Sequence, residues 1–496
     1  MTVRTDRLLS ELVSSTAGVA IRTWYGGRAG PKDARATIVV RSPTALAWLF
    51  RAPGQLGLGR AYVSGDLDVE GDIFAVIDLP QHPAQLKLRP KHWLAALRLA
   101  GPALLRQMAV PPEEARLRGV RHSPERDRAA ISHHYDISNR FYELILGPAM
   151  TYSCAYWKPG VTALEDAQAA KHDLIAAKLH LKPGMRLLDV GCGWGALVRH
   201  MAAHYGVRAV GVTVSARQVE WAAQRGTGAG ATAAEGATAA EGTPAQGGVS
   251  AITAEGPGAG RMAGVRTTAA EAATVVGTDL RTTGAELSVK ELAVQGGSEP
   301  GVAHVAAVTI RLQDYREVDD GPFDAISSVG MFEHVGRARL QTYFTRLYSL
   351  LEPGGRLLNH AISALPKSGC RPQTELDYPS LLPRWLLRRR TGFDRGSFID
   401  RYVFPDGELI EVGEVVSAMQ EAGFEVCHVE SLREHYGPTL RAWLANLEHN
   451  WDQAVAAVGD RRARIWRLYM AASARTFETG RTSVHQVVGV KPVGSA

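Results

Sequence analysis

The stretch MRLLDVGCGWG, residues 185–195, decides the fold of this 496-residue chain. Its first six residues form a short apolar run typical of a buried β-strand, and a glycine-rich turn follows. Next come ALVRHMAAHY (196–205), which has helical periodicity, and RAVGVTV (208–214), which predicts a second buried strand. A strand, a glycine turn, a helix and a strand in this order predict one unit of a parallel α/β sheet.

Five further strands are predicted downstream, which brings the total to seven. They are 306–312, 323–329, 354–362, 423–431 and 484–492. A helical stretch, RLQTYFTRLYSLL, separates the second of these from the third. Because strands alternate with helices, the predicted fold class is α/β, with one seven-stranded, doubly wound sheet.

Composition divides the chain into four segments. A smaller α+β domain is predicted at 1–125, and the sheet domain at 126–225 and 304–496. Between its two parts, Gly, Ala and Thr make up 46 of the 78 residues of 226–303, and none is aromatic. Because this segment has too little apolar surface to offset the entropy of ordering, we expect a mostly disordered insertion. A short ordered piece around 279–293 is the alternative.

Charge and composition limit the class of protein. Hydrophobic residues make up 45% of the chain, which excludes wholesale disorder, and no apolar run is long enough for a membrane-spanning helix. The first residues lack the apolar run of a secretory signal, and four cysteines are too few for a disulfide framework, so we expect a cytoplasmic protein. The net charge of +6 favours an anionic partner.

Two basic stretches are candidates for contact with that partner. Residues 91–108 form an amphipathic helical stretch, and 383–396 contain five arginines beside Trp385 and Phe393. Both are typical of contact with anionic lipid headgroups, whereas no motif for nucleic-acid binding accompanies them. The alternatives are a domain-packing helix for the first stretch and a solvated surface loop for the second.

The glycine turn itself predicts a nucleotide-containing ligand. LDVGCGWG has the spacing D-x-G-x-G-x-G rather than the G-x-G-x-x-G of dinucleotide-binding folds, and no acidic residue ends the second strand at Thr213. These features argue against NAD. The pattern resembles class I methyltransferases that use S-adenosylmethionine (SAM), in which a carboxylate after the second strand usually binds the ribose. We expect Thr213, Ser215 and Gln218 to compensate for its absence.

Four further motifs cluster around the predicted sheet. HYDISNRFY (134–142) and MTYSCAYW (150–157) precede it, GMFEHVG (330–336) follows its fourth strand, and His360 lies at the end of the fifth. Because the carboxyl ends of parallel strands line one crevice, Glu333 and His360 are predicted to point towards the glycine turn.

Together these motifs resemble the cyclopropane-fatty-acyl-phospholipid synthase family, which includes the mycolic acid cyclopropane synthases. DYRE (314–317), FIDRYVFPDGEL and HYGPTLRAW extend the resemblance over nearly the whole chain outside 226–303. The resemblance implies SAM-dependent methylene transfer to the cis double bond of an unsaturated phospholipid at the membrane surface. It further implies a lipid-carrier type of N-terminal domain, peripheral association with the inner face of the membrane, and a homodimer; no nucleic acid is expected.

The resemblance also implies site residues and a second small ligand, bicarbonate, which serves as the base. The bicarbonate-binding residues would be Cys154, Glu333, His360, Ile362 (through its backbone) and Tyr436. The SAM-binding residues would be Tyr135, Tyr152, Ser153, Asp189, Gly191, Gly193, Gly195, Thr213, Ser215 and Gln218. No metal is expected, since the Glu-His pair of GMFEHVG lacks the HExxH spacing of zinc sites.

Several alternatives stay open at this stage. Glu333 either accepts a proton from the hydroxyl of bicarbonate or orients His360, and Tyr436 could simply precede a helix that starts at Pro438. The same carbocation could yield a methylene- or methyl-branched chain instead of a cyclopropane. A methyltransferase for a small soluble substrate and a lipid-binding protein without catalysis are the remaining candidates.

Overall fold

The computed structural model describes residues 18–52, 54–79, 90–105, 108–226, 307–365 and 397–494. All of the described residues belong to one compact unit. The predicted insertion beyond Gly226 and the arginine-rich stretch 383–396 lie outside the described residues.

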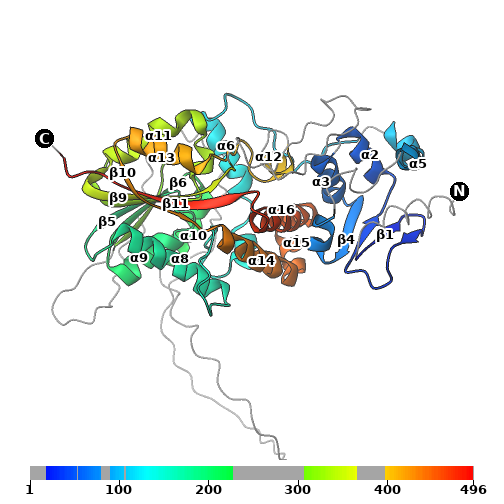
Figure 1. Cartoon of the computed structure of the whole chain (residues 1–496), viewed down its shortest axis with the longest axis horizontal. Coiled ribbons are helices and arrows are strands. Elements are labelled where there is room, and N and C mark those ends of the chain that lie inside the picture. Colours follow the sequence, from blue (N-terminus) through cyan, green and yellow to red (C-terminus); the bar gives the residue numbers. More distant parts are fainter. Residues whose placement is uncertain are drawn as a thin grey trace, which may run out of the picture. The chain divides into compact units, whose positions relative to one another are not determined.

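Seven strands form the larger sheet, in the order β10-β11-β9-β8-β5-β6-β7 (Figure 1). They are β5 (Arg186–Val190), β6 (Arg208–Thr213), β7 (Val308–Leu312), β8 (Phe323–Val329), β9 (Leu351–Ser363), β10 (Glu425–Ser431) and β11 (Ser483–Val490). All seven predicted strands and the α/β fold class are therefore confirmed. One difference is that β11 runs antiparallel to both β9 and β10. An apolar strand has the same pattern in either direction, so the sequence does not indicate this reversal.

Successive residues of each strand face opposite sides of the sheet, and helices cover both sides. Leu187 packs on the side of α8 (Leu164–Leu179), α9 (Ala196–Tyr205) and α10 (Ala216–Gly226). Its neighbour Leu188 packs on the opposite side with α11 (Leu340–Ser349) and α13 (Val412–Glu421) (Figure 1). This sandwich of helices, sheet and helices buries the central strands on both faces and fixes the positions of the loops at their ends.

A helical layer rich in aromatic side chains completes the domain. It consists of α6 (Pro124–Tyr135), α7 (Asn139–Leu146), α12 (Phe398–Tyr402), α14 (Arg433–His449), α15 (Trp451–Val458) and α16 (Asp460–Glu478). Trp443 and Trp466 are among its largest buried side chains. Short 3-10 turns lie at Gly101–Leu104, Tyr315–Glu317, Phe332–His334 and Arg337–Arg339.

The N-terminal residues form a separate four-stranded sheet in the order β2-β1-β3-β4. Its strands are β1 (Val19–Thr23), β2 (Arg28–Ala29), β3 (Ala36–Val40) and β4 (Leu67–Gly71). The helices are α2 (Thr44–Arg51), α3 (Gln55–Val63), α4 (Ile73–Ile77) and α5 (Pro90–Ala100). Trp48 of α2 is buried against Ala61 of α3, so this sheet has a small core of its own.

Helix α16 binds this smaller sheet through two arginines. Arg464 forms an ion pair with Asp68 of β4 at 3.0 Å. Arg467 donates to the main-chain oxygens of Val69 at 3.1 Å and Gly71 at 3.2 Å. Carbonyl groups at the end of β4 are therefore satisfied by the guanidinium group of a helix about 400 positions later in the chain.

Replacing Arg467 with Met is expected to lower the free energy of unfolding by about 2 kcal/mol, because main-chain acceptors lose their donor and the guanidinium group makes several bonds at once. Differential scanning calorimetry would measure the change. Arg22→Met is the matched control: its ion pair with Glu70 on the same sheet is exposed, so a loss well under about 1 kcal/mol is expected. Equal losses in both variants would contradict the importance of the α16 contact.

Candidate active site

A pocket lies at the carboxyl ends of β5, β6 and β8. The glycine turn, the residues after β6 and the loop 330–335 contribute much of its lining, and α6 and residues 150–153 contribute another side. Helix α6 begins sharply, since the Ser123 hydroxyl accepts from the amide of Arg126 at 3.3 Å and Pro124 occupies the first turn. The pocket has the position at which parallel α/β sheets bind ligands.

The glycine turn depends on backbone conformations that other residues rarely adopt. Gly191, Gly193 and Gly195 have φ angles of 81°, 56° and 80°. A Cβ atom on Gly191 would lie 2.7 Å from Cβ of Met331, and one on Gly195 would lie 2.3 Å from Cδ1 of Ile310. Gly191 and Gly193 line the pocket, whereas Gly195 packs against the sheet behind it.

Asp189, near the end of β5, is a buried carboxyl group in the pocket lining. Its Oδ1 accepts a hydrogen bond from Ser327 Oγ at 2.7 Å. Burial raises the pKa of Asp189 to about 6, while the bond from Ser327 and the nearby Lys171 oppose this rise. The carboxyl group is therefore mostly ionised at neutral pH and can bind a cationic group of a ligand.

The polar residues at the end of β6 and just after it are joined by hydrogen bonds. Thr213 Oγ1 donates to Gln218 Oε1 at 2.6 Å, and both residues line the pocket. Ser215 lies outside the pocket lining, and its hydroxyl donates to Asp136 Oδ1 at 2.6 Å. A carboxylate thus lies near the end of the second strand after all, supplied by the HYDISN motif rather than by the strand itself.

Tyr135, Tyr152 and Ser153 all line the pocket. The Tyr152 hydroxyl lies 3.3 Å from that of Tyr469, and the Ser153 hydroxyl accepts from Nζ of Lys171 at 3.0 Å. Burial raises the pKa of Tyr135 and Tyr152 above the usual value, so both phenols are neutral at physiological pH. We refer to Tyr135, Tyr152, Tyr436 and Tyr469 as the tyrosine cluster.

Glu333 is buried just after β8, and its two oxygens have different surroundings. Oε1 accepts from the amide of Ile362 at 2.7 Å, whereas Oε2 has no partner among the described residues. Burial raises the pKa of Glu333 to about 7, against the effect of the bond from Ile362. Glu333 therefore holds Ile362 and makes no hydrogen bond to His360, so it does not orient His360 directly.

His360 is oriented by Gln486 of β11 instead. The side-chain amide of Gln486 lies 3.2 Å from His360 Nδ1, and Lys178 Nζ bonds to Gln486 Oε1 at 2.5 Å. Because Lys178 can only donate, the amide nitrogen of Gln486 faces the ring, and it donates to Nδ1. The ring proton then lies on Nε2, since burial lowers the pKa of His360 to about 3 and keeps it neutral.

Cys154 and Tyr436 are also buried. Cys154 Sγ lies 3.3 Å from the oxygen of Ala155 and 3.6 Å from that of Leu432, and burial raises the pKa of the thiol, so it is a weak donor. Tyr436 lies in the first turn of α14, which begins at Arg433, so the interpretation of a helix starting at Pro438 is wrong. Pro438 lies inside α14, where it cannot donate a main-chain hydrogen bond to the carbonyl of Glu434.

The predicted bicarbonate-binding residues adjoin the pocket without lining it. Glu333 contacts Ile362 directly. Burial, assisted by the charges of Cys154, Glu333 and neighbouring tyrosines, raises the pKa of Tyr436, which places these groups within electrostatic range of one another. Cys154, Glu333, Ile362 and Tyr436 therefore lie near one another behind the pocket rather than in its wall, and His360 lies two residues before Ile362 on β9.

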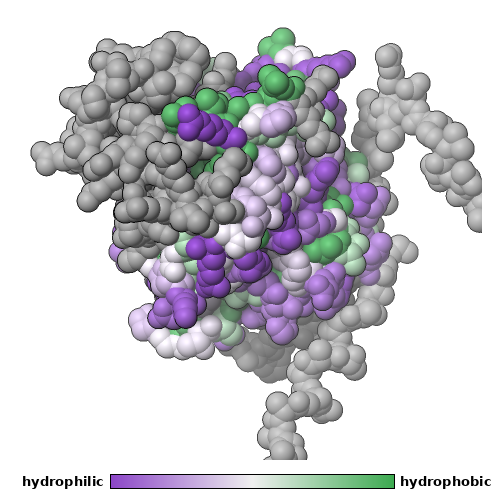
Figure 2. All heavy atoms as spheres, turned by 90° about the vertical axis from the view of Figure 1, so that its right-hand side faces the viewer, coloured by the Kyte–Doolittle hydropathy of each residue, from purple (hydrophilic) through white to green (hydrophobic). Residues whose placement is uncertain are grey.

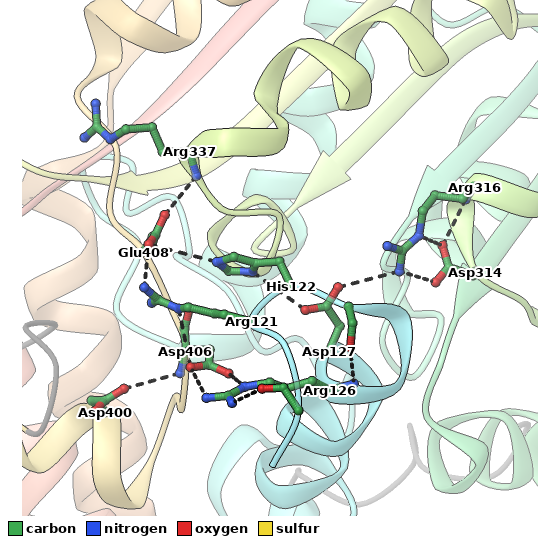
Figure 3. A network of polar contacts seen from close by, with 12 residues as sticks. Arg121, His122, Arg126, Asp127, Asp314, Arg316, Arg337, Asp400, Asp406 and Glu408 are labelled. Carbon is green, nitrogen blue, oxygen red and sulfur yellow. Dashed lines mark hydrogen bonds and ion pairs between the residues drawn. The ribbon is translucent and has the colours of Figure 1, made fainter. Parts of the chain in front are cut away.

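A network of ion pairs holds the rim of the pocket on the side of α6 (Figure 3). Arg121 pairs with Glu408 at 2.7 Å, and Arg126 donates to Asp406 at 2.9 Å. His122 lies between Asp127 and Glu408, and these carboxylates raise the pKa of His122 to about 9, so it is cationic at neutral pH. The start of α6 is thereby fixed to the segment 406–408.

The network reaches the pocket through Asp127, Asp314 and Arg316, which all belong to its lining. Neither these three residues nor Lys171 were predicted from the sequence as functional candidates. The DYRE motif (314–317) was a signal for two of them, because it follows the third strand directly. Among the described residues, no group of His, Cys, Asp and Glu side chains is arranged to hold a metal ion.

Comparison with known proteins gives one family. Residues 122–239 and 257–487 match the family model of mycolic acid cyclopropane synthetase. A probable fatty acid methyltransferase of Mycobacterium tuberculosis is 38% identical over 477 residues, which cover 94% of this chain and 89% of that protein. The cyclopropane-fatty-acyl-phospholipid synthase of Escherichia coli is 29% identical, covering 97% of this chain and 92% of the relative.

A solved structure agrees with these relatives. The crystal structure of the mycolic acid cyclopropane synthase CmaA1, complexed with S-adenosylhomocysteine (SAH), is 27% identical with a TM-score of 0.51. The match covers 73% of this chain and 98% of that chain, so 27% of the present chain has no counterpart there. The predicted SAM-dependent methyltransferase is therefore confirmed, and so is the fold of its sheet domain.

Proposed function

The chain belongs to the mycolic acid cyclopropane synthetase family, and on this premise we propose that it transfers a methylene group from SAM to the cis double bond of an unsaturated phospholipid acyl chain. The observation that carries the proposal is Glu333, a buried carboxyl group with one unpartnered oxygen beside the tyrosine cluster and the cofactor pocket. The product would be a cyclopropane ring within the acyl chain.

The reaction starts from a weak nucleophile, so positioning and exclusion of water matter most. An alkene carbon attacks the sulfonium methyl, the carbon–sulfur bond breaks to give SAH, and positive charge remains on the other alkene carbon. Tyr135 and Tyr152 line the pocket and are partly buried against the aromatic core. A reacting carbon brought beside them would be shielded from water, which would otherwise capture the cation.

The tyrosine cluster suits a carbocation for a second reason. Aromatic faces attract cations, and a neutral phenol does so without acting as a nucleophile. Burial raises the pKa of Tyr469 to about 12 and that of Tyr436 well above its usual value. At physiological pH the cluster therefore offers π-faces and no phenolate that could trap the intermediate.

Ring closure requires loss of a proton from the added methyl group. Bicarbonate, when bound, would supply the base. The buried cluster fits such an anion, because His360 can donate from Nε2, the Cys154 thiol is protonated, and Glu333 Oε2 lacks a partner. Two oxyanions can lie side by side only if they share a proton, and a carboxyl group with a pKa of about 7 is suited to accept one.

A second product is favoured by two relatives. Proteins of Mycobacterium tuberculosis and Pseudomonas putida, 38% and 33% identical to this chain, are named probable fatty acid methyltransferases rather than cyclopropane synthases. The same carbocation gives a methylene-branched chain when the proton is lost elsewhere, and reduction of that chain by a partner enzyme would give a methyl branch. The position of the base relative to the methyl group would decide between these outcomes.

Mass spectrometry of liposomes tests the proposal. Monounsaturated phospholipid vesicles would be incubated with the protein and methyl-deuterated SAM. The expected product carries a CD₂ group and takes up no hydrogen under mild catalytic hydrogenation, as a cyclopropane does. A labelled product that still takes up hydrogen would indicate the branched alternative. Labelled SAM turnover on a soluble acceptor, with no labelled lipid, would overturn both.

The phospholipid substrate requires contact with a membrane, and helix α5 is suited to it. No helix within the described ranges is both long and apolar enough to cross a bilayer, so we propose a surface contact. Leu94 and Leu97 of α5 are 48% and 45% exposed, and Arg98 lies beside them. No acidic residue occurs between Leu79 and Pro112. Figure 2 views the side of the molecule that carries the N-terminal sheet and shows hydrophobic residues next to hydrophilic ones on this face.

Replacing both Leu94 and Leu97 with Glu is expected to weaken binding to vesicles of anionic phospholipid by about tenfold or more, because apolar contact is lost and negative charge is repelled. Cosedimentation with vesicles would measure it. Val429→Glu, which changes an equally exposed apolar side chain on β10, is the control and should bind normally. Equal binding by the double variant would exclude α5 from the contact.

A further inference from the structure

Lys171 is the one buried Lys or Arg residue in the part of the chain that the structure describes, and only 2% of its surface is exposed. It lies on α8, lines the cofactor pocket, and donates from Nζ to Ser153 Oγ at 3.0 Å. An ammonium group has three donors, so the bond to Ser153 leaves two of them for other acceptors. A buried ammonium group is costly unless an anion or several acceptors compensate for the lost water.

The pocket contains an opposite charge that does not pair with Lys171. Asp189 also lines it, yet no ion pair within 4.0 Å joins the two among the described residues, and Asp189 accepts from Ser327 instead. Burial lowers the pKa of Lys171 to about 8, while Asp189 opposes this shift. At neutral pH a cation and an anion thus lie apart in one pocket, an arrangement complementary to a ligand that carries both charges.

SAM carries such a pair of charges at its amino-acid end, an ammonium and a carboxylate. We propose that Lys171 binds the carboxylate of this amino-acid group, next to Ser153, while Asp189 lies on the side of the ammonium. The inference rests on the proposed function, because SAM is the ligand. Lys171 thereby becomes a binding residue for the methyl donor, one that the glycine-turn motif does not include.

Bicarbonate is a second anion that the ammonium group of Lys171 could bind. Lys171 acts on the ionisation of Cys154 and His360 as well as on Asp189, so its charge also reaches the residues proposed to bind bicarbonate. The bond to Ser153 and the place in the pocket lining favour SAM, since neither Cys154 nor His360 lines the pocket. If Lys171 binds the carboxylate of SAM, its replacement weakens SAM binding even without bicarbonate. If Lys171 binds bicarbonate, its replacement has an effect only when bicarbonate is present.

Calorimetric titration with two analogues of SAH tests the proposal in bicarbonate-free buffer. One analogue lacks the amino group and keeps the carboxylate, and the other lacks the carboxylate and keeps the amino group. Lys171→Met is expected to weaken the first by about tenfold to a hundredfold, as for a lost charge-assisted hydrogen bond, and the second by less than about twofold. Asp189→Asn is expected to give the opposite pattern.

Loss of affinity for both analogues in Lys171→Met would indicate a merely structural role and overturn the proposal, and so would an effect that requires added bicarbonate. If Lys171→Met fails to fold, the affinities of the wild-type protein still test the proposal. The wild-type protein must bind the analogue without the carboxylate at least about tenfold more weakly than it binds SAH. Equal affinities would overturn the role of Lys171 alone. Absence of any SAH binding by the wild type would overturn the proposed function itself.

Discussion

Replacing Glu333 with Gln is expected to reduce turnover by about a hundredfold or more, while SAH binds with unchanged affinity. Glutamine has the same shape and keeps an acceptor for the amide of Ile362, which donates to Glu333 Oε1 at 2.7 Å. It cannot take up a proton. The loss would therefore measure proton acceptance by Glu333 and not a change in the shape of the buried cluster.

The same substitution is expected to stabilise the protein at high pH. The pKa of Glu333 rises from 4.5 to about 7 on folding, so ionisation opposes folding increasingly as the pH rises from 4.5 and fully above 7. Gln removes this penalty. The gain in unfolding free energy should therefore increase by about 2 kcal/mol between about pH 5.5 and about pH 8.5.

Turnover and chemical denaturation at these two pH values would test both effects. Glu408→Gln is the control for stability, because hydrogen bonding to His122 and contacts with Arg337 and Arg121 lower the pKa of Glu408 to about 2. A carboxylate of this kind stabilises the fold above pH 4.5, so its loss should destabilise the protein at both pH values. Normal turnover of Glu333→Gln would show that Glu333 does not accept a proton in the reaction.

Replacing Gly191 with Ala is expected to weaken SAH binding by more than about tenfold and to lower the unfolding free energy by about 2–4 kcal/mol. Two causes add together. The φ angle of 81° is unfavourable for alanine, and the new Cβ would overlap Met331, whose Cβ and Cγ would lie 2.7 and 2.8 Å away. Relief of the overlap requires movement of either the glycine turn or the loop after β8, and both line the pocket.

Gly184→Ala separates the two causes. Gly184 has a φ angle of 85°, but a Cβ there would meet nothing within 4 Å, and the residue precedes β5, away from the pocket. It should lose only about 1–2 kcal/mol of stability and keep full SAH affinity. Calorimetry with SAH would compare the variants. If both behaved alike, the contact with Met331 would have no part in cofactor binding.

Local sequence patterns were sufficient for the sheet, because each strand is an apolar run between helices or turns that can be found without knowing its neighbours. The direction of β11 was not predictable in this way, since it depends on the pairing with β9 and β10. The positions of the motifs correctly predicted that Glu333 and the glycine turn lie at the carboxyl ends of their strands. The hydrogen-bond partners of two site residues were not predictable, because they depend on how the strands pair. These partners are the amide of Ile362 for Glu333 and the side chain of Gln486 for His360.

Residues from distant segments were the least predictable part of the site. Lys171 lies in α8, the helix before β5, outside every motif found in the sequence, and only folding places it at the pocket. Asp136 likewise reaches Ser215 from 79 positions earlier in the chain. The insertion predicted from composition lies outside the described residues and stays a prediction, and the proposed membrane contact rests on charge pattern together with the exposed leucines of α5.

The topology around β6 and β7 has a consequence for how this protein can be extended or labelled. β6 ends at the pocket, α10 returns along the sheet to Gly226, and β7 begins at Val308 beside Ala209, the second residue of β6. The chain therefore leaves and re-enters the domain at the edge opposite the pocket. Since each doubling of a connection costs only about 0.6 kcal/mol, evolution or an engineer can lengthen the chain here, or insert a reporter, without approaching the chemistry.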